Sequence, residues 1–172
     1  MTDVIHEIAE TASDSSRDHR PAVREAAQSA YEALFDAFPD DPVPGVDRTL
    51  RHLLAARAAW LDGDRAAADW YLARAVGVEA GADLVTHGAD GIAGAAAPRP
   101  LRAALRHVDL LVRRPAAATA DDLAALSAAG WSPAEVVVIS QIVGFVSYQV
   151  RVAHALRILD DIDTPDREEQ QR

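Results

Sequence analysis

The strongest structural signal in the sequence is a helix start at residues 131–136. Ser132 is a preferred N-cap residue, Pro133 suits the first helical position, and Glu135 is placed to reach back to the cap. Trp131 precedes the cap and is positioned to pack against Val136, one turn into the helix. The sequence therefore predicts that a helix begins at this point.

The segment that follows, residues 136–150, is predominantly apolar. Its opening run of three valines and an isoleucine suits a strand, but no turn signal follows before Leu159 and no partner strand is visible. We predict instead a helix that is apolar nearly all round and is buried at the centre of the fold, with Gly144 admitting a close neighbour. The run is shorter than the ~20 apolar residues of a membrane span, so no membrane partner is expected.

Helical periodicity and capping residues recur along the rest of the chain. A short helix is expected near Val4, and the next one, from Pro21, has its core face at Val23, Ala27, Ala30, Leu34 and Phe38. Further helices are expected from Asp47 to Gly63, from Asp64 towards Gly77, near Leu84, from Pro100 to Pro115, and from Thr119 to Gly130. Residues 88–97, rich in glycine and alanine, are expected to form a loop.

These elements predict an all-α fold, a helical bundle of about six to eight helices. A chain of 172 residues fits one domain of common size. We expect that domain to span residues 1–160, with residues 1–20 as an N-terminal arm and residues 161–172 as a disordered charged tail. The N-terminus lacks a basic segment followed by an apolar one, so a cytoplasmic location is expected.

The composition excludes several classes of function. The net charge of −10 argues against nucleic acid as a partner, because binding to a phosphate backbone depends on clustered Lys and Arg. All 17 basic residues are arginine, so the chain contains no lysine. This excludes Schiff-base chemistry on a lysine and a P-loop with its phosphate-binding lysine. The chain has no cysteine and therefore no thiol chemistry of its own.

Two stretches of the chain carry a family pattern. One, residues 101–159, includes Arg113-Arg114-Pro115-Ala116-Ala117-Ala118-Thr119-Ala120-Asp121-Asp122-Leu123 and Ala129-Gly130-Trp131-Ser132, and the other includes Ala56-Arg57-Ala58-Ala59-Trp60-Leu61-Asp62-Gly63. Together they resemble peroxidase-related proteins of the alkylhydroperoxidase AhpD-like, carboxymuconolactone decarboxylase-like superfamily. The resemblance implies an AhpD-like helical fold and a homo-oligomer, either a dimer or a trimer.

The long helix matches the family pattern in part. Where the family commonly carries Asn-x-x-Asn-Arg-x-Ala, this chain reads Ser147-Tyr148-Gln149-Val150-Arg151-Val152-Ala153. The arginine and the alanine match, and both asparagine positions differ.

The redox motif of the family is missing from this chain. Redox-active members carry Cys-x-x-Cys-x-x-x-His after a glycine that corresponds to Gly63, with a glutamate upstream. Two thiols one helical turn apart can form a disulfide, and a helix N-terminus with a nearby His–Glu relay lowers the thiol pKa. Here the pattern falls on Asp64, Ala67 and Tyr71, with His52 upstream. The resemblance therefore implies the scaffold without thiol peroxidase or disulfide-reductase activity, and leaves open whether the chain is an enzyme.

The candidate catalytic residues are His52, Asp64 and Tyr71. At the mouth of the family's active site they would form an acid–base trio suited to a small polar ligand. The alternative is structural, because Asp is a preferred N-cap residue and Tyr often packs half-buried. Arg151 is the candidate substrate-binding residue: within an apolar helix its charge needs a carboxylate, carbonyl or ligand partner. That partner is either an acidic residue across a helix or subunit interface or a substrate carboxylate.

No metal site and no cofactor are expected. The six histidines show no i, i+4 pairing. Only a site assembled from separate helices, by His52, His107 and His154, stays open as a minor alternative.

Three hypotheses of function follow. The first is a non-redox AhpD-like protein, an accessory or degenerate relative whose partner is itself or a cysteine-bearing AhpD-like paralogue. The second is a cofactor-free lyase or isomerase of the carboxymuconolactone decarboxylase type, acting on a small carboxylated substrate by proton transfer. The third is a structural subunit, which predicts a broad apolar interface and no concave polar site.

Overall fold

The computed structural model of the chain describes residues 3–11, 19–36 and 43–163. Within these ranges the backbone forms nine α-helices, two short 3-10 helices and no strand, which confirms the predicted all-α fold. The elements are α1 Val4–Ala9, α3 Pro21–Phe35, α4 Arg48–Leu61, α5 Arg65–Leu72, α6 Gly81–His87, η1 Gly88–Asp90, α7 Ile92–Ala96, α8 Arg99–Arg113, η2 Pro115–Ala117, α9 Ala120–Ala128 and α10 Pro133–Asp163.

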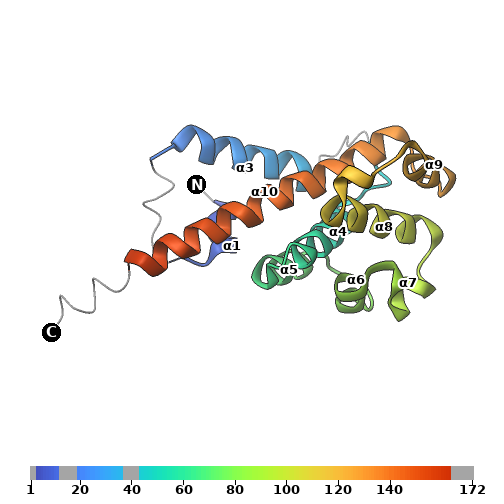
Figure 1. The fold of residues 1–172 in the computed structure, drawn as a ribbon, viewed down its shortest axis with the longest axis horizontal. Helices are drawn as coiled ribbons and strands as arrows, with labels where there is room; N and C mark the ends of the chain where they lie inside the picture. The colour runs from blue at the N-terminus through green and yellow to red at the C-terminus, as the bar shows by residue number, and fades with distance from the viewer. Residues whose placement is uncertain (1–2, 12–18, 37–42, 164–172) are drawn as a thin grey trace.

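Helix α4 is the centre of the fold. It contacts α3, α5, α6, α8 and α10, and every residue from 51 to 59 is buried. Figure 1 shows α10 crossing the molecule along its long dimension, with α8 and α9 near its N-terminal end and α1 towards its C-terminal end. The alanines of α4, including Ala55, Ala56, Ala58 and Ala59, have no exposed surface, so neighbouring helices pack closely against its backbone.

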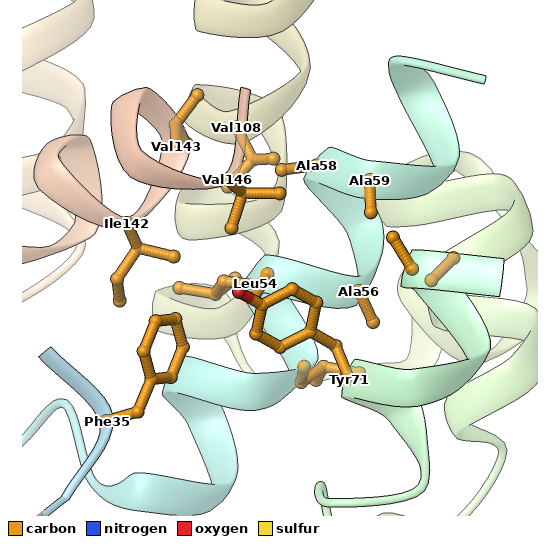
Figure 2. Packing of buried hydrophobic residues seen from close by; sticks show 14 of the residues in the cluster. Phe35, Leu54, Ala56, Ala58, Ala59, Tyr71, Val108, Ile142, Val143 and Val146 are labelled. Carbon is orange, nitrogen blue, oxygen red and sulfur yellow. The ribbon is translucent and has the colours of Figure 1, made fainter. Parts of the chain in front are cut away.

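Large core side chains come from α4 itself and from three helices around it, α3, α5 and α10. Figure 2 shows the rings of Phe35 and Tyr71 packed beside Leu54, with Ile142 and Val146 of α10 on the other side. Each of these five side chains is fully buried.

The predicted helix boundaries with local capping signals are confirmed. Asp47 accepts the N–H of Leu50 at 2.8 Å and so caps α4. Gly63 adopts a φ of +91°, a left-handed conformation that glycine reaches without strain, and turns the chain from α4 into α5. At the start of α10, the Ser132 N–H donates to Glu135 Oε2 at 2.7 Å, and the Glu135 N–H donates to Ser132 Oγ at 3.3 Å.

The predicted loop at residues 88–97 was wrong, because this stretch forms η1 and α7. The Asp83 carboxylate accepts the N–H of Ala93 at 2.8 Å and so ties α7 to α6. A Cβ added at Gly94 would lie 2.0 Å from the Gly88 carbonyl oxygen. Glycine is therefore required at position 94, because the backbones of residues 94 and 88 pack closely together.

The predicted core face of the helix from Pro21 was rotated from the observed one. Tyr31 and Phe35 are buried with Ala27, whereas Val23 is 47% exposed. The helix ends at Phe35, and Phe38 lies outside the described residues. The stacked rings of Tyr31 and Phe35, 4.9 Å between centroids, give the face that packs into the core.

The predicted burial of the long helix at the centre of the fold was wrong for one of its faces. One face of α10 packs on α4, α8 and α1, while the opposite face carries exposed side chains such as Val137 (55% exposed) and Tyr148 (39% exposed). A Cβ added at Gly144 would have no neighbour within 4 Å, so no described helix approaches it. Helix α10 also continues to Asp163, into the predicted tail, and residues 164–172 lie outside the described part.

By length and composition alone, the stretch Pro133–Ile162 of α10 could cross a membrane. Its most apolar window has a mean hydropathy of 1.6, and 39% of that window is buried within the chain. The apolar run of residues 136–150 is too short to cross a membrane, whereas the helix that contains it spans 31 residues.

Candidate functional site

Two of the predicted catalytic residues, His52 and Tyr71, lie together inside the core. Their ring centroids are 6.2 Å apart, and Phe35 packs against both, at 5.0 Å from His52 and 5.3 Å from Tyr71. Neither His52 nor Tyr71 has any exposed surface. Figure 2 shows the Tyr71 ring enclosed by apolar side chains. The pair therefore has no access to solvent.

The hydrogen bonds of these two residues are satisfied internally. His52 Nδ1 lies 2.7 Å from the Arg48 carbonyl and Nε2 lies 3.4 Å from the Tyr31 hydroxyl, so the neutral ring donates through Nδ1 and accepts through Nε2. Burial lowers the pKa of His52 from its ordinary value of 6.5 and raises the pKa of Tyr71 well above 10.0. The Tyr71 hydroxyl donates to Gln149 Oε1. Both groups are held neutral within the core.

Asp64, the third predicted residue, has two structural partners. Its Oδ1 accepts the N–H of Ala67 at 3.0 Å, which caps α5, and its Oδ2 accepts Arg157 Nη1 at 2.6 Å. The same arginine donates to two carbonyls of α1, so Asp64 and Arg157 join α5, α10 and α1. Among the described residues, no hydrogen bond or ion pair links Asp64 to His52 or Tyr71. The structure thus places Asp64 in a separate, structural network.

Arg151, the candidate substrate-binding residue, lies on the exposed side of α10. Its Nη1 donates to the carbonyl of Ser147, one turn earlier in the same helix, at 2.9 Å. The expectation that Arg151 is a buried charge was wrong, because α10 exposes this face. Arg151 and the His52–Tyr71 pair therefore share no pocket, and these contacts give no support to the lyase hypothesis built on them.

Within the part of the chain that the structure describes, no group of three or more His, Cys, Asp or Glu side chains could hold a metal ion. His107 and His52, two of the three histidines considered above, bond to different partners, Ser140 and Arg48.

A buried arginine that the sequence reasoning did not single out links three helices. Arg57 of α4 is 2% exposed, and its guanidinium donates twice to the Asp109 carboxylate of α8, at 2.8 and 2.7 Å. Its Nη1 also donates to the carbonyls of Val85 and Thr86 in α6, at 2.8 Å each. This bidentate pair with two further acceptors satisfies four of the five guanidinium N–H groups.

A pocket of about 710 Å³ lies between α8 and α9, with Asp109, the partner of this arginine, in its wall. Its walls combine apolar side chains of both helices with five arginines, three aspartates and one histidine: Arg99, Arg102, Arg106, Arg113, Arg114, Asp90, Asp109, Asp122 and His107. We call this cavity the arginine pocket. It is the concave polar site that the purely structural hypothesis does not predict.

A signal for the arginine pocket exists in the sequence. Arg102, Arg106 and Arg113 follow one another at steps of four and seven on the helix predicted from Pro100, and Arg99 lies three residues before Arg102. This spacing places the four on one helix face. Composition counts these arginines without their spacing and so does not reveal their alignment.

Comparisons with known proteins bear on the fold. Neither a protein-family model nor a curated protein gives a significant match to the chain. Among solved structures, the chain is similar to an AhpD core, an uncharacterized peroxidase-related protein from Ralstonia eutropha. The two chains are 20% identical with a TM-score of 0.58, and the match covers 81% of this chain and 71% of the other. The chain therefore has the AhpD-like helical fold that its sequence predicted, without the cysteines of the redox motif.

Proposed function

We propose that this chain is a non-redox protein with an AhpD-like fold, which works as an accessory, self-assembling component rather than as a thiol peroxidase or a disulfide reductase. The observation that carries the proposal is the closed packing of the segment where the resemblance places the redox motif.

The three positions of that motif are occupied by structural side chains. Asp64 is 8% exposed and is bonded to the start of α5 and to Arg157. Ala67 has no exposed surface. Tyr71 is also fully buried, with its hydroxyl on Gln149. A peroxide or a disulfide substrate would meet almost no open surface at these positions, which supports a role other than redox catalysis.

Self-assembly is supported by the exposed side of α10. Residues 137, 141, 144, 148, 151, 155, 158 and 162 follow at alternating steps of four and three, and all of them are exposed. We call this row the α10 stripe: Val137, Gln141, Gly144, Tyr148, Arg151, Ala155, Ile158 and Ile162. Such spacing is that of a seam between two packed helices.

Two further features favour a second copy of this chain as the occupant of the stripe. Gly144, near its middle, leaves open space in which a helix backbone can approach closely. An apolar groove of about 640 Å³ between α9 and α10 includes Val137 and Gln141, so it extends the same surface at the N-terminal end of the stripe. The opposite face of α10 stays packed on the domain, which favours a protein partner over insertion into a membrane.

The absence of redox function is tested by the consumption of an organic hydroperoxide in the presence of a dithiol reductant. We expect the purified protein to leave the background rate unchanged. Saturable turnover by this protein alone would overturn the proposal.

Self-assembly is tested by the molar mass in sedimentation equilibrium, since one chain has a mass of 18.4 kDa. We expect a dimer or a trimer for the wild type and a lower mass for Tyr148→Glu, which places a charge in the stripe. Val23→Glu is the matched control, because Val23 is 47% exposed and belongs to α3 rather than to the stripe. A wild-type monomer at all concentrations would contradict assembly through this surface.

A further inference from the structure

We propose that the arginine pocket is a binding site for a small organic anion that carries two or more carboxylate or phosphate groups. This site is separate from the closed motif region and from the α10 stripe, and it does not depend on the proposed non-redox role. Its volume of about 710 Å³ falls within the range of small-molecule sites.

The charge of the pocket walls is opposite to that of the chain. The whole chain carries a net charge of −10, yet five arginines and only three aspartates line this cavity. Two of those aspartates already have partners: Asp109 is engaged by Arg57, and Asp122 Oδ2 accepts the N–H and the hydroxyl of Thr119 at 2.8 and 2.7 Å. The five arginines outnumber the three carboxylates, one of which is already paired with Arg57, so the wall keeps a net positive charge.

Three of the arginines are available to a ligand. Within the described part of the chain, Arg99, Arg106 and Arg113 form no hydrogen bond or ion pair, and Arg102 makes one long contact of 3.4 Å to a carbonyl oxygen. Like charges at steps of three and four on one helix face repel each other. An anion bound among them would relieve this repulsion, and the planar guanidinium matches carboxylate and phosphate oxygens in bidentate geometry.

His107 supplies a second, independent indication of a ligand. The Ser140 hydroxyl donates to the Val136 carbonyl at 2.8 Å, so the 3.0 Å contact between His107 Nε2 and Ser140 Oγ requires Nε2 to donate. Nδ1 of the neutral ring is then an acceptor, and it is buried without a partner in a side chain that is 5% exposed and lines the pocket. Buried polar atoms normally have partners, and an acceptor needs a donor, so Nδ1 suits a hydroxyl group of the ligand rather than its anionic oxygens.

Binding is tested by calorimetric titration of the full chain with citrate and with inorganic pyrophosphate at constant ionic strength. We expect at least one of them to bind, and the preferred probe tells carboxylate from phosphate recognition. Arg106→Gln should weaken that binding about tenfold, because it removes a charge-assisted contact. Arg48→Gln is the matched control: it removes the same charge from an exposed arginine outside the pocket.

Arg106 is exposed and unpartnered, so its substitution leaves the fold intact, and far-UV circular dichroism verifies this. The ¹⁵N chemical shift of His107 Nδ1 gives an independent readout and should change when the probe binds. Two results would overturn the proposal. One is no binding of either probe up to about 10 mM, which is weaker than any specific site of this kind. The other is an equal loss of binding in Arg106→Gln and Arg48→Gln, which reflects net charge alone.

Discussion

Removal of the Asp109 carboxylate should destabilise the protein strongly, because it leaves the Arg57 guanidinium charged and unpaired in the core. Breaking a buried ion pair from one side costs about 3–5 kcal/mol. Asp109 is 24% exposed, so water can reach part of the vacated site, and two carbonyls still accept from Arg57. We therefore expect Asp109→Ala to lose about 3 kcal/mol of unfolding free energy, equivalent to about 6–12 °C in Tm for a chain of this size.

The assay is urea unfolding followed by tryptophan fluorescence. An exposed ion pair gives the control: Arg48 and Asp36 lie 3.6 Å apart with side chains 60% and 48% exposed, so Asp36→Ala should cost no more than about 1 kcal/mol. The double variant Arg57→Met with Asp109→Leu should lose less than Asp109→Ala, because it leaves no unpaired charge. Two results would refute this reasoning. One is a loss of unfolding free energy below about 1 kcal/mol in Asp109→Ala. The other is a double variant that is less stable than both Asp109→Ala and Asp36→Ala.

Three further predictions concern the core and the turns. Burial lowers the pKa values of His52 and His107, so the unfolded chain binds more protons than the folded one below about pH 6.5. The unfolding free energy should therefore fall as the pH drops through that value, and level off below the folded-state pKa values. A urea midpoint that stays constant between about pH 7.5 and 5 would contradict this prediction. Tyr71→Phe leaves Gln149 without its one partner and should cost about 1–3 kcal/mol in urea unfolding, whereas an unchanged midpoint would show that this hydrogen bond contributes nothing. Gly130 follows α9 with a φ of +106°, and a Cβ added there would meet no atom within 4 Å. Gly130→Ala should therefore lower Tm through backbone strain alone. A raised Tm would argue against this backbone conformation.

The sequence predicted those parts of the fold that depend on local interactions. Asp47 and Asp64 each cap a helix through an N–H three residues ahead, and Ser132 with Glu135 forms a box within one turn. Such contacts are encoded by neighbouring residues, so the pattern of residue types is sufficient to locate them.

The errors arose where distant contacts decide the structure. Helix α10 is apolar on nearly every side, so its sequence does not show which face meets the domain. The pattern therefore predicts a buried Arg151, whereas the residue is exposed. The glycines near residue 94 predict a loop, because the sequence does not show that the Gly88 backbone packs against Gly94.

The candidate site was the hardest part to predict, for the same reason. Arg57 finds its carboxylate 52 positions away, and His107 reaches Ser140 across 33 positions. No spacing between nearby residues in the sequence predicts such pairs. The row of arginines on α8 is the exception, since helical periodicity alone aligns them on one face.

The most direct test of the account is the reactivity of a single cysteine introduced into the closed motif region. The chain has no cysteine, so one substitution gives one thiol. Ala67→Cys places it at a position with no exposed surface, and Asp69→Cys places it on the exposed side of the same helix. With both variants folded by circular dichroism, we expect a thiol reagent to label Ala67→Cys at least about 100-fold more slowly in buffer, with equal rates in urea. Labelling of both variants at similar rates in buffer would show that the motif region is open, and would contradict the claim that packing has closed it.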